Sequence, residues 1–260
     1  MPTVGRAFSN SYLAGEPAAH AFFAPVFRDP GARLARVRLA AQGTVPGALL
    51  QVLTEQQARL PQSPVRQSNL AALAAGDAAV VVTGQQIGLF LGPLYTLYKA
   101  ASAIAVARAL QEESGIRCVP LFWLQTEDHD FAEIASCTVA GRDGEPVRLE
   151  LADEYRGQGR ASVAHRVLGA QINEVLDRLA DALDPGPAAD EVLALLRAQY
   201  QPGRAMAEAF ASVLASLFAD EGLLILNPRD ARVAGLAAPI YRTAIEDAAT
   251  LELALNDRHA

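Results

Sequence analysis

The stretch 78–130 constrains the fold of this chain more than any other part of the sequence. It holds two apolar runs, 78–83 and 119–124, which are typical of buried strands. Between them lie a glycine-containing segment and a helical pattern from about Leu94 to Glu113, which stops before Gly115. The order strand, loop, helix, strand predicts a parallel pair with a right-handed crossover, as in nucleotide-type α/β folds.

Further elements are expected on both sides of this unit. An Asp-Gly turn at 143–144 separates two alternating runs and predicts a β-hairpin that leaves the sheet. The apolar run 222–226 predicts a short buried return strand. Periodic apolar patterns predict helices near 46–60, 69–75, 169–183, 188–199, 204–219 and from Ala231 to the end.

These patterns divide the chain into four consecutive parts of an α/β protein. The first part supplies an N-terminal arm and helices, and the second supplies the first half of a parallel-sheet core. The third is a connecting insertion of hairpin and helices, and the last is a return strand and helix. The boundaries are 1–76, 77–135, 136–220 and 221–260.

Composition excludes some classes of function. The net charge of −7 comes without any cluster of basic residues, which argues against a nucleic-acid partner. No stretch approaches the ~20 apolar residues of a membrane-spanning helix, and the N-terminus has no apolar leader, so we expect a cytoplasmic protein. The two cysteines, Cys118 and Cys137, are expected to fill the core, without forming a disulfide or a metal site.

The segment after the first apolar run carries a glycine at every fourth position. This spacing differs from the dinucleotide-binding fingerprint, and no Gly-Lys-Ser/Thr follows as in a Walker loop. A helix N-terminus still offers backbone N–H groups and a positive partial charge to an anion. The three glycines are Gly84, Gly88 and Gly92.

Polar residues accompany this loop. Thr83, Gln85 and Gln86 follow the strand at its carboxyl end, where ligands bind in open α/β sheets. Lys99 places a cation near the start of the helix, where helix electrostatics favour an acid. We therefore expect the loop and Lys99 to face an anionic ligand. The alternative is a tight turn with two exposed amides and a solvated lysine.

A cluster of ionisable residues ends the second apolar run, at Glu127, Asp128, His129 and Asp130. Three carboxylates and an imidazole in four residues repel one another unless a cation lies nearby. The cluster is a candidate for binding substrate hydroxyls or an amine, and His129 is a candidate acid or base. A metal site is less favoured, since neighbouring residues of an extended chain point to opposite faces. The alternative is that an aspartate caps a following helix and the others are solvated.

Two long motifs closely resemble signatures of the BshC family. One runs from Val81 to Thr96 with Lys99 beyond it, and the other runs from Phe122 to Phe131. The resemblance extends over essentially the whole chain. Shorter matches are Tyr12-Leu13-x-Gly15, Tyr200-x-Pro202-Gly203-Arg204 and Gly222-Leu223-x-x-Leu226.

This resemblance implies a fold and an activity. The fold would be a Rossmann-like core similar to nucleotidylyltransferases, with inserted connecting segments and a long coiled coil associated with homodimers. The activity would be that of a cysteine ligase, which joins cysteine to glucosaminyl-malate through the sugar amine in the last step of bacillithiol biosynthesis. The resemblance also implies an adenine nucleotide site, for ATP or ADP.

The resemblance implies that the residues of the first motif line the core pocket and that the acid cluster borders it. We take His129, Asp128 and Lys99 as the candidate catalytic residues, and eight further positions of the two motifs as substrate-binding. Within this set, the loop and Lys99 would bind a malate carboxylate or a phosphate, while the acid cluster would orient the sugar. The substrate-binding positions are Thr83, Gln85, Gln86, Gly88, Gly92, Tyr95, Glu127 and Asp130.

The chain departs from this family in length, because its members are about twice as long. The C-terminal part of the core and the coiled coil are expected beyond Ala260, so we expect a fragment, a split gene or a truncated product. Two alternatives to the ligase follow. One is a non-catalytic module that binds a nucleotide or sugar acid and needs a missing half. The other is a generic nucleotidylyltransferase-like enzyme.

Overall fold

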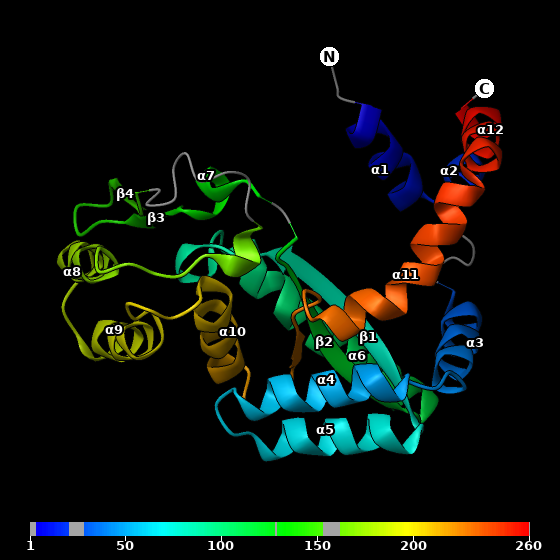
Figure 1. Ribbon diagram of the computed structural model, residues 1–260, viewed down its shortest axis with the longest axis horizontal. Helices are drawn as coiled ribbons and strands as arrows, with labels where there is room; N and C mark the ends of the chain where they lie inside the picture. The colour runs from blue at the N-terminus through cyan, green and yellow to red at the C-terminus, as the bar shows by residue number, and fades with distance from the viewer. Residues whose placement is uncertain (1–3, 21–28, 128, 153–161, 260) are drawn as a thin grey trace.

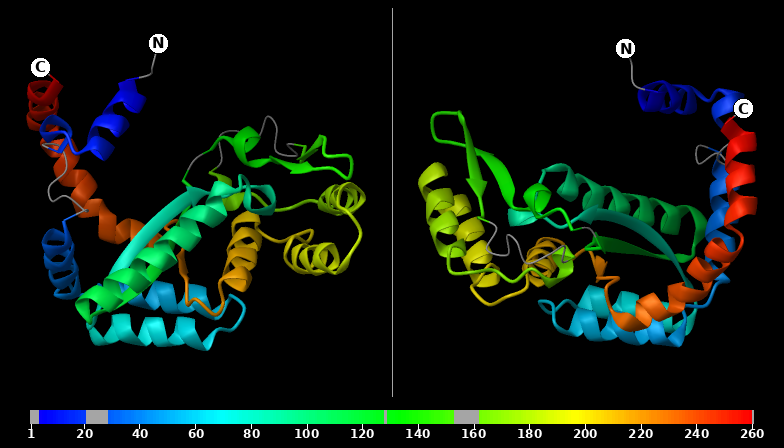
Figure 2. Two further views of the ribbon diagram at one scale, coloured as in Figure 1. Left: turned by 180° about the vertical axis from the view of Figure 1, so that it is seen from behind. Right: turned by 45° about the horizontal axis from the view of Figure 1, so that its top comes forward.

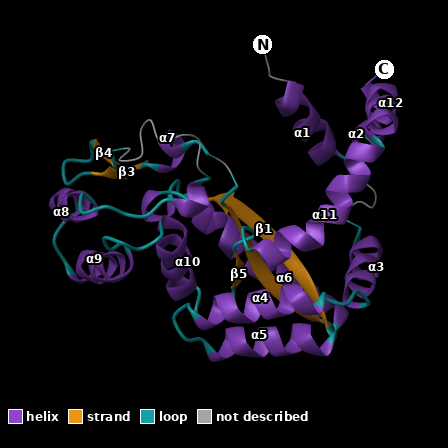
Figure 3. Cartoon of the chain, in the orientation of Figure 1, coloured by secondary structure: helices purple, strands orange, loops and turns teal. Residues whose placement is uncertain are grey.

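The computed structural model describes residues 4–20, 29–127, 129–152 and 162–259. Within these residues the core is a parallel sheet with the strand order β1-β2-β5 (Figures 1 and 3). The strands are β1 (Ala78–Gln86), β2 (Arg117–Gln125) and β5 (Leu224–Leu226). The predicted α/β fold with a parallel-sheet core is confirmed.

Helices cover both faces of this sheet (Figure 2). The crossover helix α6 (Tyr95–Ser114) and α3 (Pro30–Ala41) pack on one face, where Ala107 and Leu110 meet Cys118. On the other face lie α4 (Gly47–Ala58) and α5 (Pro64–Ala75), which bury apolar side chains against β2 and β5. Small side chains let α6 lie close to the sheet, and Gly115 ends it in the left-handed conformation, as predicted.

The insertion after β2 forms a lobe beside the sheet (Figure 1). The predicted hairpin is present as an antiparallel pair, which is followed by helices that pack beneath it. Helix α10 is the most central of these, since Phe210 and Leu214 are fully buried. The elements of the lobe are α7 (Phe131–Ile134), β3 (Ser136–Ala140), β4 (Pro146–Glu150), the 3-10 turn η2 (Val163–His165), α8 (Ile172–Ala182), α9 (Pro187–Gln199) and α10 (Met206–Leu217).

The two ends of the described chain form a separate arm of helices (Figure 1). At the N-terminal end are α1 (Val4–Ala14) and α2 (Pro17–His20). At the C-terminal end are α11 (Ala231–Glu246) and α12 (Ala248–His259), so the predicted final helix is interrupted at Asp247.

Two predicted elements differ in extent from the structure. Strand β1 continues to Gln86, three residues past its predicted end, because Gly84–Gln86 pair with Trp123–Gln125 of β2. It is also not buried on both faces, since β1 is an edge strand of the described sheet and Val82 is 59% exposed. Helix α5 begins at Pro64 instead of Asn69, because Ser63 caps it by accepting a hydrogen bond from the Arg66 N–H.

Arg232 attaches helix α11 to helix α4. Its guanidinium donates to both carboxylate oxygens of Glu55, at 3.0 and 2.7 Å, and to both of Asp230, at 3.0 and 2.8 Å. Asp230 also caps α11 by accepting the Arg232 backbone N–H at 2.9 Å. Hydrogen bonds from Arg232 lower the pKa of Asp230 from 3.8 to about 2.

We therefore predict that Asp230 makes stability depend on pH at the acid end. A carboxyl whose folded-state pKa is lowered stabilises the fold above its unfolded pKa, and this contribution disappears as the pH falls from about 4 to about 2. The Asp230→Asn variant should be less stable than the wild type at pH 6, and the gap should narrow between pH 4 and pH 2. Urea unfolding at several pH values measures this. Asp184→Asn, on an exposed turn, is the control and should follow the wild type throughout.

Candidate functional site

The carboxyl ends of β1 and β2 lie side by side at one edge of the sheet. Gln86 pairs with Gln125, and the Ile87 N–H donates to the Gln125 carbonyl at 3.4 Å. An open cleft of about 590 Å³ follows this edge, and its lining includes Thr83, Gln85, Gln86 and Trp123. The structure thus brings the predicted polar residues of β1 to the place where β2 leads into the acid cluster.

Gly84 is needed for the close approach of these two strands. A Cβ atom at this position would lie 2.7 Å from the Trp123 carbonyl oxygen and 3.2 Å from the Trp123 Cβ. Neither neighbour is the far end of a flexible side chain, so the clash cannot be relieved by a rotamer change. The glycine therefore fixes the spacing of β1 and β2 beneath the cleft.

Lys99 holds the end of β1 from the side of α6. Its ammonium donates to the Gly84 carbonyl at 3.1 Å and to Gln85 Oε1 at 2.9 Å, and it lies 5.1 Å from the centre of the Tyr95 ring. Thr83, Tyr95 and Lys99 share a second cleft, of about 320 Å³, on this face. Because Gln85 Oε1 accepts from Lys99, Gln85 presents its amide N–H groups as donors. Lys99 thus orients a neighbouring side chain as well as supplying charge.

The loop between β1 and α6 packs into the core. Ile87, Leu89 and Leu91 are buried, and the 3-10 turn η1 (Leu89–Leu91) brings Gly88 against Gly92. A Cβ at Gly88 would lie 3.0 Å from the Gly92 Cα. Neither glycine lines the clefts beside β1. These two predicted substrate-binding positions therefore lie apart from the others.

Three N–H groups of the same loop already have acceptors. The Ile87 N–H donates to the Gln125 carbonyl, the Gly92 N–H to the Leu89 carbonyl at 2.8 Å, and the Leu91 N–H to the Tyr200 hydroxyl at 3.4 Å. A phosphate cradle requires such groups to be available. These three groups are engaged within the protein, and the adenine nucleotide expected from the resemblance stays a prediction.

Tyr200 keeps the loop in an unusual conformation. Phe90 and Leu91 have φ of 49° and 74°, which non-glycine residues rarely adopt. The fully buried Tyr200 hydroxyl donates to the Gly88 carbonyl at 3.3 Å, and its ring meets that of Phe90 edge to face, with centroids 5.0 Å apart. Burial raises the pKa of Tyr200, so its phenol stays protonated and keeps donating.

The acid cluster lies exposed beyond β2. Glu127 and His129 are exposed, and Asp128 lies outside the described residues. Asp130 caps the short helix α7, because its Oδ1 accepts from the Ala132 N–H at 3.0 Å and from the Glu133 N–H at 3.4 Å. The structural alternative therefore accounts for Asp130, while Glu127 and His129 lie at the rim of the sheet edge.

Thr126 and Asn227 also belong to this edge, and the sequence reasoning did not select them. The buried Thr126 hydroxyl donates to Asn227 Oδ1 at 2.9 Å, and the Thr126 carbonyl accepts from the Ser162 hydroxyl and the Ala164 N–H. A polar residue directly after each apolar run was the available signal. Tyr200 was noticed only as part of a motif, because nothing in its sequence context indicates which loop it contacts.

Neither cysteine suits nucleophilic chemistry. Both are free thiols, Cys118 buried and Cys137 partly buried. Burial raises the pKa of Cys118, and it raises the pKa of Cys137 to about 11. Across the described ranges, no three His, Cys, Asp or Glu side chains gather in a way that could hold a metal ion. In the same ranges, no helix has the length and apolar character to span a membrane.

Comparison with known proteins identifies the family. The family described as "Bacillithiol biosynthesis BshC, N-terminal Rossmann-like domain" matches residues 2–260. The chain belongs to the BshC family. The Rossmann-like fold and the family expected from the two motifs are therefore confirmed.

Curated BshC proteins match the chain over most of its length. Three relatives, each named "Putative cysteine ligase BshC", come from Salinibacter ruber, Koribacter versatilis and Chlorobaculum tepidum. They are 38%, 36% and 34% identical over 84%, 80% and 77% of this chain. The matched regions cover 40%, 37% and 36% of those relatives, so the chain spans about two fifths of their length.

The close contact at Gly84 predicts a clear stability effect. Gly84→Ala should lower the free energy of unfolding by about 1–3 kcal/mol, as for other overpacked positions, because the added methyl meets the backbone of β2. Gly235→Ala is the matched control, since it lies in helix α11 with open space around it, and it should stabilise by up to ~1 kcal/mol. A Gly84→Ala variant as stable as the wild type in urea unfolding would contradict the close approach of the two strands.

The hydrogen bonds between the Tyr200 hydroxyl and the loop predict a second effect. Tyr200→Phe keeps the ring but leaves the Gly88 carbonyl and the Leu91 N–H without the hydroxyl. It should cost about 1–3 kcal/mol, the usual range for buried polar groups that lose their partner. Tyr98→Phe, at a position 66% exposed, serves as the control and should leave the urea midpoint unchanged. A wild-type urea midpoint for Tyr200→Phe would show that these hydrogen bonds contribute nothing to stability.

Proposed function

We propose that this chain supplies the strand-edge part of a cysteine ligase that adds cysteine to glucosaminyl-malate in bacillithiol biosynthesis. One observation carries the proposal. In a chain that belongs to the BshC family, Thr83, Gln85 and Gln86 of the first motif line a cleft with Trp123 and Gln125, at the end of the strand that leads into the second motif's acid cluster. The name of the relatives, cysteine ligase, supports the reaction type.

The residues have distinct roles in this proposal. Lys99 fixes the Gln85 side chain, and together they offer a positive charge and amide donors to a malate carboxylate. Glu127 and His129 are exposed just beyond the end of β2, and in this proposal they accept hydrogen bonds from sugar hydroxyls or the amine. His129 is suited to remove the proton that the amine loses when the amide forms. Joining the cysteine carboxyl to the amine removes the elements of water, and hydrolysis of ATP, the nucleotide that the resemblance implies, would take them up. No residue of this chain is assigned to that cleavage.

Turnover by variants tests these roles. Lys99→Met and His129→Ala should each lower amide formation by roughly tenfold to a thousandfold, because each removes a charge or a general base from the edge. Arg108→Met and His165→Ala are the matched controls and should act like the wild type. The measurement is product formation from glucosaminyl-malate and cysteine, followed by mass spectrometry. Wild-type turnover in both Lys99→Met and His129→Ala would contradict the roles assigned to these residues.

Thiol profiling tests the reaction itself. A strain without the gene should accumulate glucosaminyl-malate and lose bacillithiol. The strain is then supplied with residues 1–260 alone, or with the locus extended downstream. If the extended locus restores bacillithiol and residues 1–260 alone do not, the chain is one part of the ligase and does not act alone. An unchanged thiol pool in the deletion strain would contradict the proposed reaction.

A further inference from the structure

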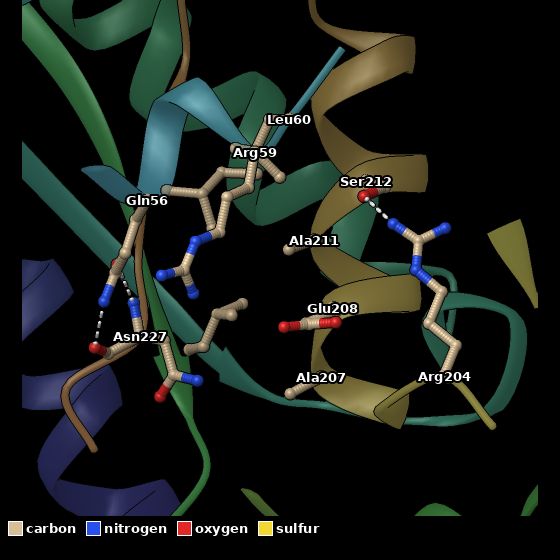
Figure 4. A pocket seen from close by; sticks show the side chains of 11 residues that line it. Gln56, Arg59, Leu60, Arg204, Ala207, Glu208, Ala211, Ser212 and Asn227 are labelled. Carbon is tan, nitrogen blue, oxygen red and sulfur yellow. Dashed lines mark hydrogen bonds between the residues drawn. The ribbon is translucent and has the colours of Figure 1, made fainter. Parts of the chain in front are cut away.

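A cavity of about 360 Å³ lies apart from the strand-edge clefts. It is a partly open pocket lined by the end of α4, by α10 and by the ends of β2 and β5 (Figure 4). It shares no lining residue with the cleft beside β1. Its volume falls within the roughly 300–1,000 Å³ typical of small-molecule sites.

One wall of this cavity carries an uncompensated cation. The Arg59 guanidinium points into the cavity (Figure 4) and forms no hydrogen bond or ion pair with any other residue that the structure describes. Asp230 interacts with Arg59 only through its charge, because both of its carboxylate oxygens are hydrogen-bonded to Arg232. Arg59 is therefore available to a ligand anion.

Asn227 presents a donor on the same side. Its Oδ1 already accepts from the Thr126 hydroxyl at 2.9 Å and from the Arg229 N–H at 3.2 Å. The side chain of Gln56 fixes its backbone through two hydrogen bonds of 2.9 Å. The amide NH₂ of Asn227 consequently faces the cavity (Figure 4). A guanidinium and an amide N–H on one wall suit a carboxylate.

The opposite wall carries an anion. Glu208 extends from α10 toward the cavity, and its carboxylate has no partner within the described ranges (Figure 4). Arg204, the other cation nearby, is engaged elsewhere, because it donates to Ser212 Oγ at 2.7 Å and to the Gln199 carbonyl at 3.1 Å. Glu208 is therefore suited to a ligand ammonium group.

We propose that this cavity binds a small zwitterionic α-amino acid. The carboxylate lies against Arg59 and Asn227, the ammonium against Glu208, and the side chain over the buried surfaces of Leu60, Leu124 and Ile225. Glu208 repels a dianion such as malate, and Arg59 repels a diamine. If the proposed function holds, the amino acid is cysteine, so this identification rests on the proposed function. The site for a zwitterion is argued independently of it.

Ligand analogues test the two charges separately. Titration calorimetry with L-cysteine under reducing conditions should show binding to the chain. 3-Mercaptopropionate lacks the ammonium and cysteamine lacks the carboxylate, so each should bind about 10- to 100-fold more weakly, as expected for a lost charged hydrogen bond. Equal affinity for all three compounds, or no binding of L-cysteine at millimolar concentration, overturns the proposal.

Variants locate the binding in this cavity. Arg59→Gln and Glu208→Gln should each weaken L-cysteine binding about 10- to 100-fold. Glu208→Gln should also lose the preference for L-cysteine over 3-mercaptopropionate, which a merely structural role would not change. Arg38→Gln and Glu191→Gln, both exposed, are the matched controls and should bind like the wild type. Since Arg59 and Glu208 are themselves exposed residues, unfolding curves should match the wild type. Wild-type affinity in both test variants excludes the cavity.

The outcome is separable from that of the proposed function. Selective binding of L-cysteine that depends on Arg59 and Glu208, together with an unchanged thiol pool in the deletion strain, upholds the site and rejects the ligase. Loss of bacillithiol in that strain, together with variants that bind cysteine normally, upholds the ligase and rejects the site.

Discussion

The parallel pairing of β1 with β2 is the interaction on which the rest of the structure depends. It joins Ala78–Gln86 to Arg117–Gln125 without a break, and Gly84 allows the two backbones to approach beside Trp123. This register decides that both polar motifs end at the same edge. It also sets the position of α6, which must span the distance between the two strands and pack on one face.

The glycine-rich motif acts through packing more than through an open cradle. Ile87, Leu89 and Leu91 are buried, three of the motif's N–H groups have acceptors, and the Tyr200 hydroxyl bridges two of its backbone groups. Positive φ at Phe90 and Leu91 is maintained by this surrounding structure. The motif therefore builds a rigid end for β1, and the polar side chains on the strand itself, with Lys99, remain for a ligand.

Two polar regions lie on either side of the end of β2. The strand-edge cleft contains Gln125, and the next residue, Thr126, donates to Asn227, which lines the cavity beside β5. This hydrogen bond joins the residue that follows the cleft lining to a residue of the cavity lining.

The sequence by itself determined the order of strand, loop, helix and strand, the hairpin and the family, because these follow from local periodicity, turn chemistry and two long motifs. It also placed Gln85, Gln86 and Lys99 near one another. Only the tertiary structure decided that Gly88 and Gly92 are packed together, that Asp130 is a helix cap and that Val82 is exposed. It alone brought Arg59, Asn227 and Glu208 around one cavity. The physical reason is that burial and hydrogen-bond partners are set by segments far apart in the chain, whose meeting leaves no local signal.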